Sequence, residues 1–364
     1  MLKEAIHDVS ERRDLTRLRI SEVFEEIFAG RATAAQVGAL LLALRMKGET
    51  VEEVTGAALS LRARARPMRT PRGRVVMDTC GTGGDGAGTF NVSTAVAFVV
   101  AAAGVTVAKH GNVRVSSSCG SADVLAAAGV NIHASLECVE RCLEEVGIAF
   151  VLAPLFHPVM REVAAVRRDL GVRSIFNVLG PLVNPARAQR QLLGVYDRAL
   201  VPIVAGALLA LGTERSLVVH GTHGDKGLDE VSPSGPTHAS LIEEGRVTEM
   251  TIHPEDAGVE RQGAAGGCEA ALQGGDAEQN ARMLRDVLGG ATGALREVVV
   301  LNAAAALWVS GTAGDLREGA TRARALLDDG SAARKLEALA RMTQAHAARE
   351  PELTARLAEG SVAS

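Results

Sequence analysis

The stretch RVVMDTCGTGGDGAGTFNVSTAVAFVVAAAG, residues 74–104, places a short apolar run, a glycine-rich segment and a longer apolar run in succession. The first run has the length of a buried strand and the last has that of a buried helix. Glycines let the backbone between them adopt positive φ and approach an anion closely, and the helix start adds the positive end of its dipole. The stretch therefore predicts a strand, a phosphate-type loop and a helix. The spacing is not GxxxxGK[ST] and only loosely GxGxxG, so the loop alone is equally consistent with a tight structural turn.

Apolar segments continue to alternate after this unit. Short strands are expected at VTVAKHG (105–111), IAFVLAP (148–154) and SLVVHG (216–221), with alanine-rich or amphipathic helices between them. The segment HASLIEEGRVTEMTIHP (238–254) has the pattern of a hairpin, and EVVVLNAAAALWVSG (297–311) that of a helix. Strands alternating with helices predict an α/β fold with a mostly parallel central sheet.

The first 66 residues have a different, helical pattern. In ISEVFEEIFAG (20–30) the apolar residues share one helical face, and Thr33 with Gln36 and Thr50 with Glu53 have the spacing of capping boxes. The connector PMRTPRGR (67–74) follows. We therefore expect a small N-terminal helical domain over residues 1–70, joined by a segment that returns to it near 165–190, and an α/β domain over 71–364.

Composition excludes several classes of protein. The 364 residues carry a formal net charge of -4 and only 2% aromatic residues, which disfavours a nucleic-acid surface. Five cysteines without a CxxC pair indicate neither a disulfide framework nor a zinc site. The N-terminus lacks a signal peptide and no apolar run is long enough for a membrane span, so we expect a cytoplasmic protein without membrane or nucleic-acid partners.

Two further loops carry candidate ligand residues. KHGNVRVSSSCGSADV (109–124) places a lysine and several serines after the next expected strand, and HGTHGDKGLDEVSP (220–233) contains the adjacent carboxylates Asp229 and Glu230. The loops at the carboxyl ends of parallel strands open on one edge of the sheet, where ligands bind in such folds. A lysine suits phosphate, and paired carboxylates suit Mg²⁺ that is shared with substrate phosphates. Among Arg167, Arg168 and Arg173, one guanidinium is a candidate for holding a carboxylate.

These stretches, in this order, resemble the anthranilate phosphoribosyltransferase family over nearly the whole chain. The resemblance rests on GTGGDG (81–86), TFNVST (89–94), KHGN (109–112), GSADVL (120–125), LGVRSIFNVLGPLVNPA (170–186), LDEVSP (228–233), GGDAEQNARMLRDVLGG (274–290) and LNAAAAL (301–307). It implies a fold of nucleoside phosphorylase type, often a homodimer through the helical domain. It also implies a Mg²⁺-dependent transfer of phosphoribosyl from phosphoribosyl pyrophosphate to anthranilate in tryptophan biosynthesis.

The same resemblance assigns roles to individual residues. Lys109, Asn112 and Arg167 would be the catalytic residues. Gly81 and Asn112 would contact anthranilate, and Arg167 would bind its carboxylate. Ser93, Asp229 and Glu230 would hold Mg²⁺. Substrate would be bound by Gly81, Gly84, Asp85, Thr89, Asn91, Ser93, Thr94, Lys109, His110, Gly111, Asn112, Ser116, Ser117, Ser121 and Arg167.

The chain departs from the family pattern in one loop and beside one pocket. Val113 and Arg114 stand where Arg-Ala usually follows KHGN, and Ser118 and Cys119 where Lys-Ser is frequent, so the loop has lost or relocated a cation. Leu152 replaces an expected aromatic residue.

The expected chemistry stabilises a leaving pyrophosphate and needs no strong base, although His110 is a candidate proton acceptor. Two alternatives stay open at this point: a pyrimidine nucleoside phosphorylase, and a non-catalytic nucleic-acid-binding relative.

Overall fold

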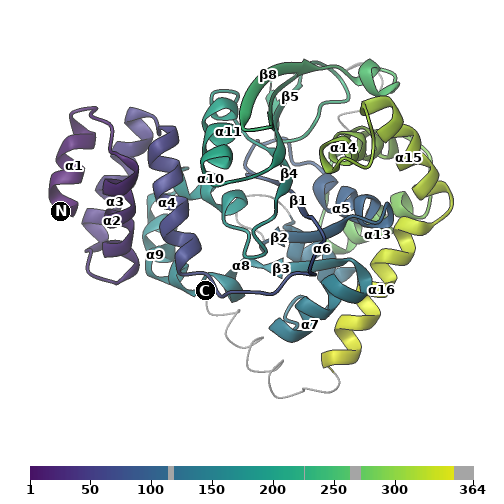
Figure 1. The fold of residues 1–364 in the computed structure, drawn as a ribbon, viewed down its shortest axis with the longest axis horizontal. Helices are drawn as coiled ribbons and strands as arrows, with labels where there is room; N and C mark the ends of the chain where they lie inside the picture. The colour runs from purple at the N-terminus through teal and green to yellow at the C-terminus, as the bar shows by residue number, and fades with distance from the viewer. Residues whose placement is uncertain (114–118, 225, 263–271, 348–364) are drawn as a thin grey trace.

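Four helices form the N-terminal lobe of the computed structural model, which describes residues 1–113, 119–224, 226–262 and 272–347 (Figure 1). The helices are α1 (Leu2–Ser10), α2 (Arg17–Phe28), α3 (Ala34–Lys47) and α4 (Val51–Ala63). Both expected capping boxes are confirmed: the Oγ1 of Thr33 and of Thr50 accepts the backbone N–H three positions on, and the N–H of each threonine donates back to the side chain of Gln36 or Glu53. The connector after α4 contains neither helix nor strand.

Two later helices lie against this lobe. They are α9 (Arg161–Leu170), which contacts α2 and α3, and α10 (Ile175–Leu182), which contacts α3 and α4. The ring of Phe176 on α10 lies 5.5 Å from the ring of Phe24 on α2, measured between centroids. The N-terminal lobe is therefore packed together with a segment that is distant in the sequence.

An eight-stranded sheet forms the second lobe, in the order β3-β2-β1-β4-β5-β7-β8 with β6 paired to β5. The strands are β1 (Val76–Gly81), β2 (Thr106–Gly111), β3 (Ile148–Leu152), β4 (Arg190–Gly194), β5 (Arg215–His223), β6 (Lys226–Leu228), β7 (Thr237–Glu243) and β8 (Arg246–Ile252). The pairs from β3 to β5 are parallel and the pairs of β5 with β6, β5 with β7 and β7 with β8 are antiparallel. The predicted α/β fold with a mostly parallel sheet is confirmed, as is the hairpin of β7 and β8.

Alternating side chains of the sheet belong to two different hydrophobic cores. Leu192 and Leu217 contact the core beneath the C-terminal helices, whereas Leu193 and Val218 belong to the core shared with the N-terminal lobe. This follows from the period of two residues along a strand.

The remaining helices are α5 (Val92–Ala102), α6 (Ser121–Ala127), α7 (Leu136–Arg141), α8 (Ala153–Phe156), α11 (Leu200–Ala210), α13 (Ala277–Leu288), α14 (Ala294–Ser310), α15 (Leu316–Asp328) and α16 (Ser331–Ala347).

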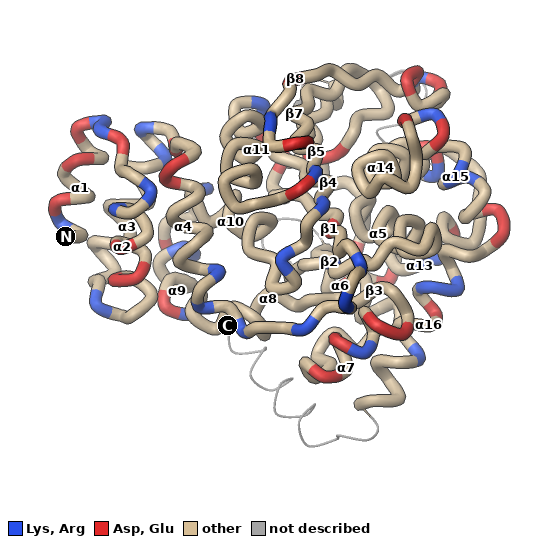
Figure 2. The backbone as a smooth tube through the Cα atoms, viewed as in Figure 1, with Lys and Arg blue, Asp and Glu red and all other residues tan. Residues whose placement is uncertain are grey.

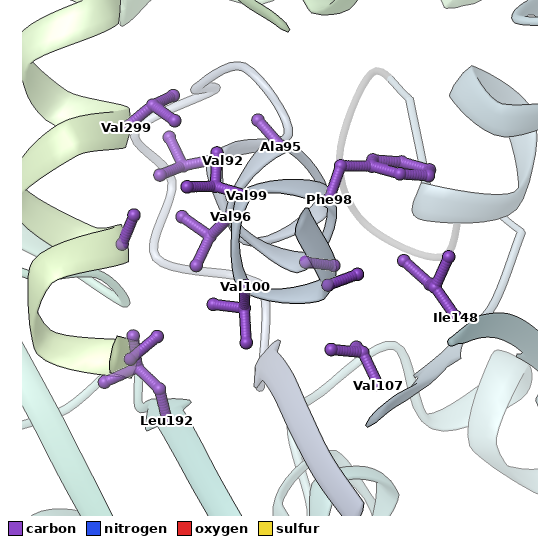
Figure 3. Packing of buried hydrophobic residues seen from close by; sticks show 14 of the residues in the cluster. Val92, Ala95, Val96, Phe98, Val99, Val100, Val107, Ile148, Leu192 and Val299 are labelled. Atoms are coloured by element: carbon purple, nitrogen blue, oxygen red, sulfur yellow. The ribbon is translucent and has the colours of Figure 1, made fainter. Parts of the chain in front are cut away.

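Helix α5 is buried along nearly its whole length. Figure 3 shows Val96 and Val100 of α5 between Val299 of α14 and the strand residues Leu192 and Val107. A helix that is apolar on every side is stable only inside a core. Its N-terminus is thereby held rigidly at the carboxyl end of β1.

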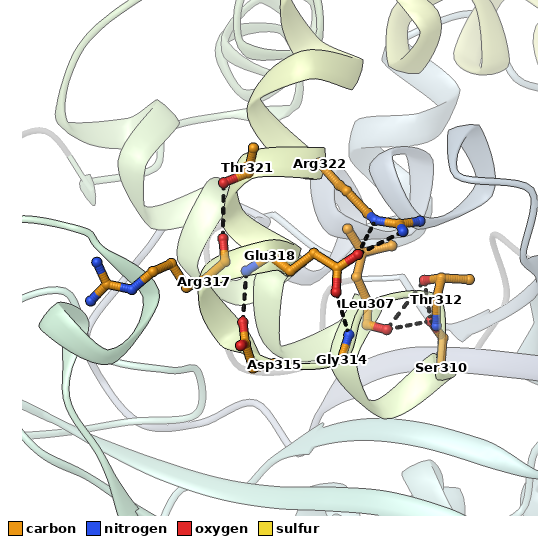
Figure 4. A network of polar contacts seen from close by, with 9 residues as sticks. All are labelled: Leu307, Ser310, Thr312, Gly314, Asp315, Arg317, Glu318, Thr321 and Arg322. Atoms are coloured by element: carbon orange, nitrogen blue, oxygen red, sulfur yellow. Dashed lines mark hydrogen bonds and ion pairs between the residues drawn. The ribbon is translucent and has the colours of Figure 1, made fainter.

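The turn between α14 and α15 is fixed by local polar contacts. Asp315 caps α15 by accepting the N–H of Glu318, and the Glu318 carboxylate accepts the N–H of Gly314 and a bond from Arg322 (Figure 4). These contacts stabilise the helix end and involve no residue predicted to bind substrate.

Charges of both signs are interspersed over the outer helices in the view of Figure 2, while the central strands carry few of them. Within the described residues, no helix combines the length and the apolar character that crossing a membrane requires.

Candidate active site

A cavity of about 450 Å³ opens where β1 and β2 end. Its lining includes most of the predicted site residues: Gly81, Gly84, Asp85, Thr89, Asn91, Ser93, Thr94, Lys109, His110, Gly111, Asn112, Ser121, Asp229 and Glu230. Ser116 and Ser117 lie outside the described residues, as do Arg114 and Ser118. A larger hollow of about 840 Å³ lies beside the connector and α7, and it contains no predicted site residue.

The glycine loop, residues 81–91, runs from β1 to α5. Gly83, Gly84, Gly86 and Gly88 all have positive φ, between 64° and 77°, a conformation that other residues rarely adopt. Gly81 is required for a different reason, because a Cβ there would lie 2.3 Å from an Asp229 carboxylate oxygen. The glycines thus shape the loop and let the acidic residue approach it.

Both adjacent carboxylates contact this loop and the start of α5. Asp229 Oδ2 accepts the N–H of Gly83 at 2.8 Å, and Glu230 Oε1 accepts the N–H of Ser93 at 3.0 Å. Burial and the neighbouring Asp85 raise the pKa of Asp229, and burial and the charge of Asp229 raise the pKa of Glu230. The cavity wall therefore concentrates negative charge in a poorly hydrated place, where a cation would stabilise it.

Oxygen donors of this kind fit a hard divalent ion. The described residues contain no group of three or more His, Cys, Asp or Glu side chains that could hold a metal by themselves. Mg²⁺ commonly binds through one or two carboxylates and completes its coordination with water and substrate phosphates. The donor set is consistent with an ion that binds together with a phosphorylated substrate.

Lys109 supplies a buried cation beside these carboxylates. Its side chain extends from β2, and Nζ donates to the Thr79 carbonyl at 2.7 Å and to Ser93 Oγ at 3.3 Å. Lys109 is only 3% exposed, and burial lowers its pKa although Asp78 and Glu230 act in the opposite direction. A positive group is therefore held beside Ser93 at the start of α5.

His110 is buried next to a second histidine. Its Nδ1 lies 3.1 Å from the Gly180 carbonyl, its ring centroid lies 5.3 Å from that of His157, and Nε2 has no hydrogen-bond partner among the described residues. Burial lowers the pKa of His110 to about 3 and that of His157 to about 4. Both rings are therefore neutral near pH 7, and Nδ1 of His110 carries the proton that faces Gly180.

The loop after β2 packs closely on the start of α6. A Cβ on Gly111 would lie 2.2 Å from Ser121 Oγ, and the Asn112 carbonyl accepts the N–H of Ala122 at 3.1 Å. Val113, one of the departures from the family pattern, is 40% exposed. Cys119, another departure, is buried and lines the cavity.

The arginines occupy different places from one another. Arg167 does not line the cavity; it extends from α9 with its guanidinium 5.2 Å from the ring centroid of Phe176, and burial lowers its pKa. Arg173 instead donates from Nη2 to the Gly84 carbonyl and lies 4.3 Å above the Tyr196 ring. The structure therefore brings Arg173, rather than Arg167, to the glycine loop.

The segment 272–276, which no sequence motif had indicated as part of the site, also reaches the cavity. Gln273 and Gly274 line the cavity, the Leu272 carbonyl accepts the N–H of Phe90 at 2.7 Å, and Gly274 donates to the Gly88 carbonyl at 2.9 Å. A glycine pair directly before a helix cap, as in QGGD (273–276), is the signal that could have indicated a close approach.

Comparisons with known proteins agree with this geometry. Residues 73–333 match the model of the glycosyl transferase family, a/b domain, and residues 3–65 that of the glycosyl transferase family, helical bundle domain. An anthranilate phosphoribosyltransferase of Anaeromyxobacter sp. (strain K) is 54% identical over 343 residues, which are 94% of this chain and 99% of that protein.

Solved structures are similar as well. The anthranilate phosphoribosyltransferase of Thermus thermophilus superposes with a TM-score of 0.85 and 40% identity, covering 93% of this chain and 99% of that one. The Saccharomyces cerevisiae enzyme in complex with phosphoribosyl pyrophosphate and Mg gives a TM-score of 0.83 and 26% identity, covering 94% of this chain and 98% of that one.

Proposed function

The chain belongs to the anthranilate phosphoribosyltransferase family, and from this premise we propose which of its residues carry out the reaction. The enzyme transfers the phosphoribosyl group of phosphoribosyl pyrophosphate to the amine of anthranilate and releases pyrophosphate, a step of tryptophan biosynthesis. Neither the nucleoside phosphorylase nor the nucleic-acid-binding alternative is favoured by these relatives.

The phosphoribosyl pyrophosphate site is the 450 Å³ cavity. One observation carries this proposal: the glycine loop, the loop after β2 and the acidic pair line the same cavity although they lie far apart in the sequence. Glycine backbone, the start of α5 and Lys109 together provide the donors and the positive charge that a diphosphate requires.

Ser93, Asp229 and Glu230 are proposed to hold Mg²⁺ together with the substrate's own oxygens. The yeast relative was solved with both ligands. When bound, the ion neutralises negative charge that develops on the leaving pyrophosphate. The raised pKa values of the two carboxylates support this assignment, because a cation would remove the unfavourable repulsion.

The chain's own residues then have three tasks. Lys109 and the backbone donors of the glycine loop stabilise the negative charge of the leaving pyrophosphate. Such stabilisation by groups already held in place is usually the largest single contribution to an enzyme's rate enhancement. Asn112, which lines the cavity, and Arg167, which lies on α9 outside that lining, are proposed to orient anthranilate, whose neutral amine is already nucleophilic. Neutral His110 lines the cavity and serves as a hydrogen-bonding residue rather than as an obligatory base.

A homodimer through the helical lobe is proposed from an exposed apolar patch. Leu42 and Met46 on α3 and Val172 after α9 are 42%, 69% and 48% exposed and line one shallow hollow. Apolar side chains grouped in this way indicate a contact surface.

We assign residues 1–70 to the helical domain and 71–364 to the α/β domain, and we place the enzyme in the cytoplasm.

The direct test mixes the protein with anthranilate, phosphoribosyl pyrophosphate and Mg²⁺ and follows the loss of anthranilate fluorescence. Turnover that needs all components is expected. Absence of turnover, together with phosphate-dependent cleavage of a pyrimidine nucleoside, would overturn the assignment in favour of the phosphorylase.

A further inference from the structure

Three segments that line the cavity are connected by a chain of hydrogen bonds through two asparagines. The N–H of Gly275 donates to Asn280 Oδ1 at 2.7 Å, Asn280 Nδ2 donates to Asn91 Oδ1 at 3.0 Å, and Asn91 Nδ2 donates to the Cys119 carbonyl at 3.2 Å. The chain of bonds runs from the segment before α13, through the glycine loop, to the backbone of Cys119, which precedes α6. It therefore connects parts of the protein that are up to 189 residues apart in sequence.

The backbone at both ends determines how the two amides are oriented. Because the Gly275 N–H can only donate, it must face the oxygen of Asn280, so the Asn280 nitrogen faces Asn91. Because the Cys119 carbonyl can only accept, it must face the nitrogen of Asn91, which turns the Asn91 oxygen towards Asn280. Both asparagines thus have one compatible orientation each, and neither can rotate without breaking two bonds.

Asn280 itself is shielded from the cavity. It is 1% exposed and is absent from the described residues that line the cavity, whereas Asn91 and Cys119 do line it. Breaking hydrogen bonds at such a buried amide leaves unsatisfied partners, which is costly. Any influence of Asn280 on substrate must therefore be transmitted through the residues that it holds.

The segment 272–276 lies tightly against the glycine loop beside this chain of bonds. A Cβ on Gly274 would lie 3.0 Å from the Thr89 carbonyl oxygen, and Thr89 forms an isolated bridge with Gln273. Together with the bond from Phe90 to Leu272, these contacts hold the half of the glycine loop that precedes α5. Asn280 completes the arrangement by holding Asn91, the last residue before that helix.

We propose that Asn280 is a positioning residue for the phosphoribosyl pyrophosphate site, acting through Asn91 on the relative placement of the glycine loop and the Cys119 backbone that precedes α6. The proposal rests on the proposed function of this cavity. It predicts that the donor substrate depends on Asn280 and that anthranilate depends on it much less.

Asn280→Asp is the sharpest variant. It keeps the oxygen that accepts the Gly275 N–H and replaces the donor that faces Asn91 by an acceptor. We expect the KM for phosphoribosyl pyrophosphate to rise about tenfold or more, while the KM for anthranilate changes less than about threefold. Asn280→Ala should have the same selectivity.

Thr343→Val is the matched control. Thr343 is a buried helix residue of α16 whose Oγ1 accepts a loop N–H, that of Asn131, at 3.0 Å, and it does not line the cavity. It should lower the melting temperature with both KM values unchanged. A KM for the donor within twofold of wild type in Asn280→Asp, or equal rises in both KM values, would overturn the proposal.

Two measurements separate this proposal from the proposed function. Calorimetric binding of phosphoribosyl pyrophosphate with Mg²⁺ needs no turnover. Even if the wild-type protein binds this substrate without reacting, weaker binding by Asn280→Asp than by wild type still measures the effect of Asn280. If the variants do not fold, hydrogen exchange of wild type decides: bound donor should slow exchange of the Gly275 amide, although Gly275 does not line the cavity. Unchanged exchange at saturating donor would contradict the connection.

Discussion

Replacing Glu230 by Gln removes a negative charge from the cavity and keeps a hydrogen-bond acceptor. Glu230 Oε1 accepts the N–H of Ser93 at 3.0 Å, and the amide oxygen of Gln can accept the same bond. The start of α5 should therefore keep its place. What changes is the charge that faces Mg²⁺ in the proposed site.

The expected loss can be worked from Coulomb's law. Opposite unit charges about 4 Å apart attract by about 4 kcal/mol at an effective dielectric constant of about 20. Because the Gln oxygen remains a neutral ligand and Asp229 remains charged, part of the attraction for Mg²⁺ is retained. We expect the Mg²⁺ concentration for half-maximal activity to rise about 100-fold and kcat to fall by about 10- to 1000-fold.

Stability should change in the opposite direction. Burial and Asp229 raise the pKa of Glu230, so its charge opposes folding at every pH above the pKa of the unfolded chain. Removing it should raise the melting temperature of the protein at pH 7 without Mg²⁺. An enzyme that becomes more stable and less active is the signature of a functional charge.

Steady-state rates over a range of Mg²⁺ concentrations, with calorimetric melting of the same samples, test this reasoning. Glu243→Gln serves as the control, because Glu243 pairs with Arg215 at the end of β7 and does not line the cavity. Unchanged kcat and Mg²⁺ dependence in Glu230→Gln would remove Glu230 from the metal site. Loss of activity accompanied by a lower melting temperature would assign it a structural role instead.

Three further variants test other parts of the proposal. Arg167→Ala should raise the KM for anthranilate at least tenfold with little change for the donor, and the exposed neighbour variant Arg168→Ala should change neither; equal losses for both ligands would refute the assigned role. Burial lowers the pKa of His157 to about 4, so the protein should lose stability as the pH falls from about 6.5 towards 4. Chemical denaturation of His157→Gln should show up to about 3 kcal/mol less of this loss. A pH dependence of stability equal to that of wild type would contradict the role of His157. Met46→Asp should give a monomer in analytical ultracentrifugation while Leu18→Asp, outside the patch, should not; a Met46→Asp dimer would exclude the patch as the interface.

Much of the fold could be predicted from the sequence because its signals are local. The alternation of apolar strands and helices, the capping boxes at Thr33 and Thr50, and the hairpin of β7 and β8 each depend on residues a few positions apart. Left-handed glycines such as Gly83 and Gly84 are likewise local requirements of the backbone. Because β1 and β2 run in the same direction, the loops that follow them open on the same edge of the sheet.

Other features depended on packing between distant segments. Nothing near Arg173 in the sequence indicates that it reaches the Gly84 carbonyl while Arg167 turns to Phe176, because both follow from how α9 and α10 pack on the N-terminal lobe. Asn280 is an ordinary helix residue by sequence, and only the tertiary structure brings it to Asn91. A sequence by itself specifies backbone conformations and the residue types that a loop can offer; which side chains meet is decided by the free energy of the whole packed core.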